Sequence, residues 1–407
     1  MDCKFYLNYL KMANLAISCL FGEKSYKKKH KKIKEKSCRT NDSTDGKYNE
    51  ELESWLNSIA YREFVYTENE LFSPLSIFNV VGMLFFGAEE ETKTNFRMIM
   101  NTRDEKCITS LARFFKTYDK ALLQNNYIHH LHGHRFDPII IRKWINFPYK
   151  TSIKNYHDDF IHVINNDISE PLSSLGWNCF TKLPLKRSFM FVHTVTVKGS
   201  WINSFDAKLT TKEEFIVNKH TQKLPMMKQK GLFKYYETRK HRFLNMEVQN
   251  EGKKFFFVLI LNKKSKKKLD YRYKDIKDGC EFVTSNYCNY HRVNLELPKF
   301  SIQKNHNLNY IINKMVKSDF MDKQLNLDTM FIKWHSTDFN CRSSAFISVN
   351  ETGLSTGEVD NSMRCKEHHT NLKTIDFECN RPFVFYLFVK DDETIPILYG
   401  KYKGNPD

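Results

Sequence analysis

The stretch ISVNETGLSTGEVDNSMRC, Ile347–Cys365, begins as a strand and then changes character. Phe346, Ile347 and Val349 fit a half-buried strand in which apolar and polar residues alternate. After Glu351 the residues become small, glycine-containing and acidic, a composition that is depleted in sheets. The sequence therefore predicts a strand that ends near Glu351, with the glycines and acids after it outside the sheet in a long exposed loop.

The length and composition of the chain indicate a large folded domain. It has 407 residues, 41% of them hydrophobic and 27% charged, and its 14 glycines and 10 prolines are too few for a fibrous or disordered protein. Helical patterns come early, in NEELESWLNSIAYREFV from Asn49 and in FSPLSIFNVVGMLFFGA from Phe72, where Ser73-Pro74 marks a helix start. Strand-like runs dominate later. We therefore predict an extension over residues 1–48 and one α+β domain over residues 49–407.

The formal net charge of +17 is concentrated in two lysine-rich runs, Lys24–Lys36 and the run that begins at Lys263. The candidate basic patch in the second run comprises Lys263, Lys264, Lys266, Lys267 and Lys268. Such runs are usually solvated, and no zinc-finger spacing, homeodomain-like helix or RNA-binding aromatic motif accompanies them. We expect no specific nucleic-acid partner; a solvated arm and a site for a glycosaminoglycan are the two interpretations left open.

The N-terminal segment MDCKFYLNYLKMANLAISCLFGEK is arranged like a secretion signal, although Asn8, Lys11 and Asn14 interrupt its apolar part. The same interruptions argue against a stable membrane span. We expect an extracellular protein, with the cytoplasm as the alternative. The ten cysteines include no CxxC pair and do not decide between these compartments.

We expect neither a nucleophile elbow nor a metal site. The sequence contains no HExxH, P-loop or GxGxxG motif. Its densest histidine cluster, His129–Asp137, lacks a matching carboxylate pattern, which favours a solvated loop. A hydrolase triad is defined by geometry and has no fixed spacing, but nothing here indicates one, so we predict no enzyme, no catalytic residue, no cofactor and no metal.

Six stretches, in this order along the chain, resemble the serpin family of serine protease inhibitors. They are FSPLSIFNVVGMLFFGAEEETK, VTVKGSWINSFD, LPMMKQKGLFKYY, LELPKFSI, ISVNETG and FECNRPFVFYLFVKDDETIPILYGKYKGNP. The resemblance extends from about Asn49 to Pro406. It implies the serpin fold: three β-sheets, about nine helices, and an exposed reactive-centre loop between the strand that ends near Glu351 and the one that begins near Phe377.

The resemblance also implies a mechanism. In serpins a serine protease cleaves the loop, and the freed segment inserts as a new strand into the central sheet of a metastable fold. Insertion carries the acylated protease away and deforms its active site. We therefore expect a monomeric suicide substrate whose partner is a serine protease, with a non-inhibitory serpin that binds or carries another molecule as the alternative.

Residues at the opening of the central sheet are assigned by position. Ser73 and Ser76 match serines beneath the opening, and Trp201 matches the tryptophan where the loop begins to enter. Just below, the family usually has an asparagine and a histidine bonded across neighbouring strands, where this chain has His193 and Ser343. We expect a His193–Ser343 hydrogen bond, with a plain buried histidine as the alternative.

The hinge of the loop departs from the family pattern. Its matching positions are Glu351, Gly353, Leu354, Thr356 and Glu358. We expect Gly353 to let the backbone turn. Inhibitory serpins usually carry small residues after this glycine, whereas here Leu354, Thr356, Glu358 and Asp360 share one face by period two and would point inwards on insertion. Burying unpaired carboxylates costs several kcal/mol, so insertion should slow.

The position of the scissile bond follows from the usual distance between hinge and bait residue. Counted from Glu351, that distance ends at Glu367, so we predict cleavage near Lys366 and Glu367. Arg364 and Lys373 are basic alternatives that would suit a trypsin-like protease, whose specificity pocket carries a carboxylate.

Overall fold

The structure, a computed structural model, describes residues 70–100, 105–130, 135–147, 150–155, 188–217, 220–263, 273–316, 318–333, 338–355, 374–390 and 394–405. The α-helices of this part are α3 (Pro74–Phe86), α4 (Glu90–Met100), α5 (Glu105–Lys116), α6 (Pro138–Trp144), α8 (Tyr273–Thr284) and α9 (Leu308–Val316). Three shorter helical turns are η2 (Ala207–Leu209), η3 (Phe320–Gln324) and η4 (Asp328–Met330). The extension expected over residues 1–48 and the helix expected from Asn49 lie outside the described residues.

The central sheet contains β4 (Lys150–Asn155), β2 (Leu122–His130), β5 (Ser188–Val197), β14 (Asp338–Val349) and β12 (Phe300–Asn307), hydrogen-bonded in that order. Its middle pair is parallel: β14 and β5 pair from Asp338↔Ser188 to Phe346↔Thr196. For β5 the strand was expected from its apolar and β-branched residues, and for β14 only the part from Ser343 was expected, where apolar and polar residues alternate; β14 begins earlier, at Asp338.

A second group of strands forms an antiparallel layer most of whose residues are buried. It comprises β9 (His241–Asn250), β10 (Lys253–Asn262), β17 (Phe383–Lys390), β18 (Thr394–Tyr402) and β1 (Glu70–Phe72). Within it, β10 and β17 pair from Phe256↔Phe388 to Ile260↔Val384. Burial on both faces explains why KKFFFVLIL and RPFVFYLFV read as continuous apolar runs without alternation.

A third group comprises β7 (Thr211–Val217), β8 (His220–Glu237), β11 (Tyr290–Pro298) and β16 (Ile375–Glu378). The 18-residue strand β8 pairs with β7 and β11 and also, at its C-terminal end, with β9. Because β8 links the second and third groups, and the hinge region described below links the first and second, the three expected sheets form one 16-stranded network. A separate ribbon pairs β3 (Arg135–Phe136) with β13 (Phe331–Lys333).

Helix α3 lies beneath the central sheet, and all 13 of its residues are buried. It begins at Pro74, as the Ser73-Pro74 signal predicted, and it packs against β5 and β18. The Ser73 hydroxyl donates to the carbonyl of Ile397, 2.8 Å away in β18, and so does not cap the helix. Since α3 is apolar almost throughout, its few polar side chains are placed inside the protein, where each needs a partner.

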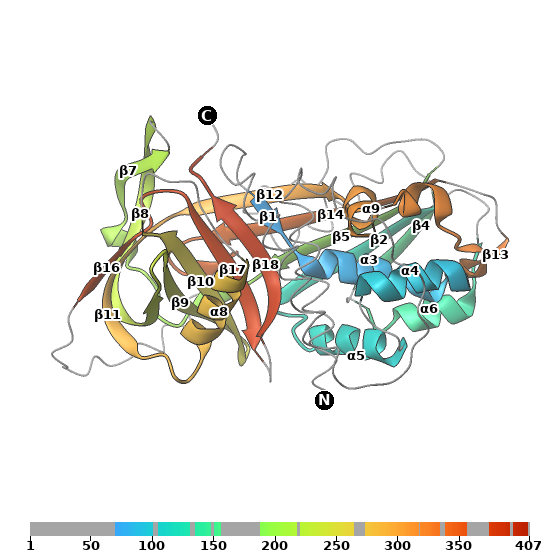
Figure 1. The fold of residues 1–407 in the computed structure, drawn as a ribbon, viewed down its shortest axis with the longest axis horizontal. Coiled ribbons are helices and arrows are strands. Elements are labelled where there is room, and N and C mark those ends of the chain that lie inside the picture. Colours follow the sequence, from blue (N-terminus) through green and yellow to red (C-terminus); the bar gives the residue numbers. More distant parts are fainter. Residues whose placement is uncertain are drawn as a thin grey trace, which may run out of the picture.

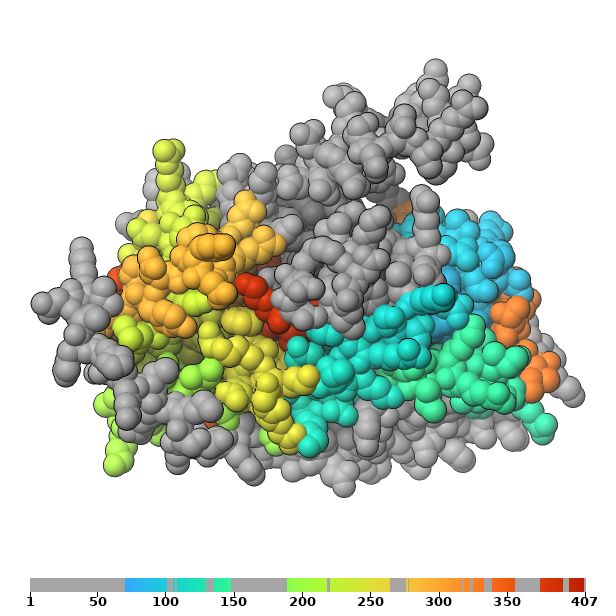
Figure 2. All heavy atoms as spheres, turned by 90° about the horizontal axis from the view of Figure 1, so that it is seen from below, coloured from blue at the N-terminus to red at the C-terminus, as the bar shows by residue number. Residues whose placement is uncertain are grey.

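The molecule is elongated (Figure 1): α3–α6 and α9 gather towards one end, the second and third strand groups occupy the other, and β5, β12 and β14 run between them. Seen from below (Figure 2), α5 and α6, in teal and green, cover one half of the face, and yellow and orange strands and helix α8 lie on the other. Within the described ranges, no helix is long and apolar enough to cross a membrane. Over the same ranges, no three His, Cys, Asp or Glu side chains are grouped as metal ligands.

Candidate functional site

The strand that decides the fold does not leave the sheet where the sequence predicted. Strand β14 ends at Val349, the chain turns over Asn350–Thr352, and Gly353–Leu354 form a short antiparallel strand, β15. This strand lies between two neighbours: Leu354 pairs with Val349 of β14, and Gly353 pairs with Ser200 of β6 (Gly199–Trp201). The expectation that the glycine after Glu351 lies outside the sheet was therefore wrong, because two strand edges satisfy its backbone.

Asn350 and Trp201 hold the turn. The Asn350 side-chain oxygen accepts from the backbone N–H of Thr352 and of Gly353, both at 3.0 Å, which is an Asx-type turn. From β6, the Trp201 indole N–H donates to the Asn350 carbonyl at 2.8 Å, and the Trp201 backbone N–H donates to the Thr352 carbonyl at 2.9 Å. Trp201 is 5% exposed and its ring packs against Phe257. Trp201 thus holds the turn between β14 and β15.

Glu351 is clamped from two sides. The Lys299 ammonium, in the bend between β11 and β12, donates to one carboxylate oxygen at 2.9 Å, and the Thr210 hydroxyl donates to the other at 3.0 Å. Burial would raise the pKa of Glu351, but the hydrogen bonds from Lys299 and Thr210 outweigh it and hold the pKa below its usual value. Glu351 therefore stays ionised and tethers the turn to two other elements.

Gly353 is needed for close approach. It has no positive φ, so the expected role in turning the backbone is wrong. A Cβ at this position would overlap the Gly199 carbonyl oxygen and would lie 2.8 Å from the Ser200 Cα. Since both obstacles are backbone atoms that cannot rotate aside, only glycine fits between β14 and β6.

The described part of the loop ends at Ser355, the residue that stops the inserted strand. Leu354 is fully buried in the core, and Ser355 is fully buried with its hydroxyl 3.1 Å from that of Thr196 in β5. Ser355 has φ +47°, a left-handed conformation that costs a non-glycine residue about 1–2 kcal/mol. To continue β15 down the sheet, Ser355 must become extended and the β14–β5 pairs below it must separate.

The letters GLSTG at residues 353–357 fit the nucleophile-elbow pattern GxSxG, so the expectation that the sequence holds no such pattern was wrong. In an elbow the serine hydroxyl is exposed to substrate at the top of a sheet. The Ser355 hydroxyl is instead buried between β5 and β14, beside Thr196 and within 3.3 Å of the Ser348 backbone N–H. Its position is that of a strand end, with no access for a substrate.

Below the inserted strand, His193 of β5 is bonded to helix α3. Its Nδ1 lies 2.9 Å from the Ser76 hydroxyl, and its Nε2 lies 3.1 Å from the Asn79 side-chain nitrogen. Ser343 is the Cα partner of His193 on β14 and is buried, but both ring nitrogens are already engaged. The expected His193–Ser343 bond is therefore replaced by bonds to α3, since each ring nitrogen has a single site in the ring plane.

The partners of His193 define its tautomer and its charge. An amide nitrogen only donates, so Nε2 accepts from Asn79, and Nδ1 carries the proton and donates to Ser76. The same Asn79 nitrogen also lies 2.9 Å from the Leu75 carbonyl and 3.0 Å from the side-chain oxygen of Gln124 in β2, so three acceptors share its two hydrogens. Complete burial lowers the pKa of His193 to about 3, and a second ring proton would point at the Asn79 donor. His193 is thus neutral at ordinary pH and joins β5 to α3.

Several predicted positions lie outside the described residues. Of the hinge these are Thr356, Glu358 and Asp360; of the candidate reactive bond, Lys366, Glu367, Arg364 and Lys373; of the basic patch, Lys264, Lys266, Lys267 and Lys268. The functional residues that sequence reasoning missed are Asn79, Gln124, Thr210, Lys299, Asn350 and Ser355. Only Asn79 had a usable signal: Ser73, Ser76 and Asn79 recur every third residue in an otherwise apolar helix.

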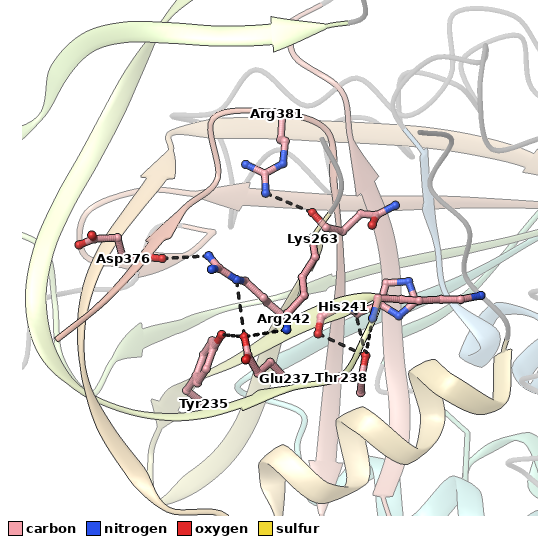
Figure 3. Close-up of polar contacts among 10 residues, drawn as sticks. Tyr235, Glu237, Thr238, His241, Arg242, Lys263, Asp376 and Arg381 are labelled. Carbon is pink, nitrogen blue, oxygen red and sulfur yellow. Dashed lines mark hydrogen bonds and ion pairs between the residues drawn. The ribbon is translucent and has the colours of Figure 1, made fainter. Parts of the chain in front are cut away.

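Lys263 belongs to a basic surface at the end of β8–β10 (Figure 3). We call it the Arg242 surface; it comprises Arg239, Lys240, Arg242, Lys263 and Arg381. Glu237 is its central acid: it accepts from the Tyr235 hydroxyl at 2.7 Å, and it pairs with Lys263 at 3.1 Å and with Arg242 at 3.9 Å. Arg242 also donates to the carbonyl of Asp376 in β16, so this surface adjoins the strand that follows the loop.

Removing the Lys299 clamp should loosen the inserted hinge. In Lys299→Ala we expect the amides of Gly353 and Ser355 to exchange with solvent about tenfold faster, because a partly exposed charged hydrogen bond is lost. Hydrogen exchange with mass spectrometry measures this. The matched control is Lys120→Ala, which breaks an exposed ion pair with Glu251. Equal exchange in both variants would show that Lys299 does not hold the hinge.

Comparison with known proteins agrees with this geometry. A family model described as serpin (serine protease inhibitor) matches residues 56–403. Antichymotrypsin-2 of Bombyx mori is 27% identical over 201 residues, which are 49% of this chain and 53% of that protein. Heparin cofactor 2 of Oryctolagus cuniculus is 22% identical over 362 residues, and the match covers 83% of this chain and 72% of that protein. The match to antichymotrypsin-2 thus spans about half the length of that relative, as does a match to an antitrypsin of Bombyx mori.

Solved structures show the same fold. The chain matches Serpin48 of the insect Tenebrio molitor with a TM-score of 0.71 at 14% identity, covering 100% of both chains. It matches tengpin, a thermophilic serpin in its native state, with a TM-score of 0.72 at 17% identity, and the match covers 100% of this chain and 95% of tengpin. At such identities the likeness concerns the fold.

Proposed function

The chain belongs to the serpin family, and from this premise we propose that it is a suicide-substrate inhibitor of serine endopeptidases and has no catalytic activity of its own. The observation that carries the proposal is β15. Gly353 and Leu354 already occupy the place between β14 and β6 in which a cleaved loop would begin its new strand. Cleavage near Lys366 would release the segment after Ser355 to continue the same path.

The path below β15 is closed by nine residue pairs between β14 and β5 and by the bonds of His193 to α3. An inserted strand would replace these pairs with pairs on both of its edges and would bury its inward side chains. Leu354, the first inward residue, is already fully buried. The free energy of this extra strand pairing and burial is released only when the loop is cut. Its release would drive the insertion that carries the attached protease away and traps it.

The side chains that follow Leu354 determine how fast the cleaved loop inserts. By period two, Thr356, Glu358 and Asp360 follow Leu354 on the inward face. Two buried carboxylates would raise the insertion barrier, and about 1.4 kcal/mol slows insertion tenfold. If deacylation then overtakes insertion, the chain is cleaved without trapping, which is the non-inhibitory alternative.

Incubation with trypsin-like, chymotrypsin-like and elastase-like proteases tests the proposal. We expect a complex with the trypsin-like enzyme that survives denaturing electrophoresis, with the released C-terminal peptide beginning near Glu367. The double variant Glu358→Ala with Asp360→Ala should form more complex per cleavage event. If the loop is cleaved without any complex, in both the native chain and this variant, the inhibitory role is contradicted and the non-inhibitory role is the one that remains.

A second candidate role, glycosaminoglycan binding, is favoured by the Arg242 surface, whose five cations include two, Lys263 and Arg242, that pair with Glu237 (Figure 3). A partner of this kind requires export of the chain, which we propose together with it. Heparin cofactor 2 is named for such a ligand. Here the charge of this surface carries the proposal.

Charge removal on the Arg242 surface should weaken heparin retention. In Lys240→Gln with Lys263→Gln we expect elution from immobilised heparin at clearly lower salt, because exposed charge interactions are screened by salt and scale with the number of cations. Lys116→Gln with Lys120→Gln, which removes two cations from a different part of the chain, is the control. Equal elution of the two double variants would contradict a site at this surface.

A further inference from the structure

A pocket lies where strand β9 changes its neighbour. Along one edge β9 pairs with β10 from His241 to Asn250. Along the other edge it pairs with β8 as far as Asn245 and then with β6 at Val248 and Gln249. The backbones of β8 and β6 diverge between these points, and a pocket of about 240 Å³ occupies the divergence.

The walls of this pocket are chiefly apolar and aromatic. They include Trp201 of β6 and Ile202 just after it, Leu232 and Phe233 of β8, Met246 of β9, and Tyr290 of β11. A cavity of about 150 Å³ holds a benzene molecule, whereas pockets for drug-sized ligands begin at about 300 Å³. The volume and the walls therefore suit one aromatic ring with a short arm.

One side of the pocket is polar. Lys234 is the Cα partner of both Tyr290 and Asn245, so these side chains form a row on one face of the sheet. Lys234 is 9% exposed, and its ammonium donates to the Ser285 carbonyl at 2.7 Å. An ammonium has three hydrogens, so it is able to bind an anion as well. The other charged group of the wall, Glu247, is paired with Lys254.

Asn245 is the unusual member of this row. It is 3% exposed, and neither polar atom of its carboxamide has a hydrogen-bond partner among the described residues. Buried amide groups normally have hydrogen-bond partners. A buried polar group that makes no hydrogen bond costs about 1–3 kcal/mol of stability. Asn245 is one of the residues that line the pocket, and its χ2 is a soft torsion, so its amide is free to turn towards a ligand there.

We propose that this pocket binds a small aromatic carboxylate, whose ring packs against Leu232 beside Trp201 and whose carboxylate accepts from the Lys234 ammonium and the Asn245 amide. The ligand supplies the partner that the Asn245 amide nitrogen lacks, and it neutralises a nearly buried ammonium. No residue of this pocket belongs to the loop, so binding does not depend on the loop being intact.

Trp201 connects the pocket to the hinge, a step that rests on the proposed function. The same indole whose ring borders the pocket donates to Asn350, and the Trp201 backbone donates to Thr352. A ligand packed on the ring stabilises the conformation in which Trp201 makes these bonds. Ligand binding therefore favours the inserted hinge.

The test uses 3-phenylpropionate as the probe, with 3-phenylpropanamide as the uncharged analogue, in titration calorimetry on the full chain. We expect a Kd of about 1 mM or tighter for the carboxylate and binding at least about tenfold weaker for the amide. Asn245→Leu, close in size and without polar atoms, and Lys234→Met should each weaken binding about tenfold or more. Lys228→Met, a lysine of the same strand outside the pocket, should bind as the native chain does.

Absence of binding by both probes to the native chain would overturn the proposal, and so would equal binding by Asn245→Leu. If Asn245→Leu does not fold, Asn245→Asp keeps the size and places a carboxylate against the probe, so undiminished binding there would also overturn it. Hydrogen exchange at Gly353 and Ser355 tests the connection separately: saturating probe should slow it in the native chain and leave it unchanged in Lys234→Met. These readouts involve no protease, so failure of inhibition and failure of the pocket are distinguishable.

Discussion

Replacing Gly353 by valine should reduce the yield of denaturant-resistant complex with a protease about tenfold or more, if the chain acts by the proposed loop insertion. The new side chain would meet the backbone of Gly199 and Ser200, neither of which can rotate aside. Overpacking of this kind costs about 1–3 kcal/mol and should expel the hinge from its place between β14 and β6, so that the cleaved loop has to re-enter against the clash; about 1.4 kcal/mol on the insertion barrier slows insertion tenfold. Deacylation is then faster than insertion, so the protease is released before the loop has inserted.

The matched control is Gly231→Val, in strand β8. A Cβ there lies 3.3 Å from the edge of the Phe233 ring, a side chain that can move, so this variant should keep the native yield of complex. Gel densitometry after incubation with the trapped protease measures both. If Gly353→Val retains full complex formation, insertion does not pass between β14 and β6.

Acid should weaken the native sheet through His193, and His193→Gln should remove that sensitivity. Burial lowers the pKa of His193 to about 3, below its ordinary value of 6.5, so the unfolded chain binds a proton that the folded chain excludes. The stability that His193 contributes is therefore complete above pH 6.5 and is lost as the pH falls towards 3. The loss is about 1.4 kcal/mol per pH unit, or about 2 kcal/mol between pH 6.5 and 5.

Urea unfolding at pH 7.5 and at pH 5 measures this loss. Glutamine accepts and donates as the neutral ring does but does not titrate, so the native chain should lose about 2 kcal/mol more than His193→Gln between these values. The exposed His220, replaced in the same way, serves as control and should leave the native pH dependence in place. Equal pH dependence in the native chain and in His193→Gln would contradict the account of this network.

The sequence predicts those parts of the fold that depend on local pattern. Helix α3 follows from Ser73-Pro74 and a continuous apolar run, and β14 and β17 follow from β-branched and aromatic residues. The serpin family itself was recognisable, because six separate stretches retain their order.

What the sequence could not predict depends on contacts between distant segments. Gly353 reads as a turn residue, and only the approach of β6 reveals why a glycine stands there. His193 was assigned to Ser343 across the neighbouring strand, whereas its partners come from the helix beneath. The clamp on Glu351 joins residues 210, 299 and 351, whose proximity no local spacing indicates.

The central claim is that the loop continues β15 down the sheet once it is cut, and the thermal midpoint of the cleaved chain tests it most directly. The chain is cleaved in the loop by a protease that it does not trap, and its unfolding is compared with that of the intact protein. A new central strand adds pairs on both edges, so we expect the midpoint to rise by about 10 °C or more, and to rise much less in Gly353→Val. An unchanged or lower midpoint, as cutting an ordinary loop produces, would contradict the claim.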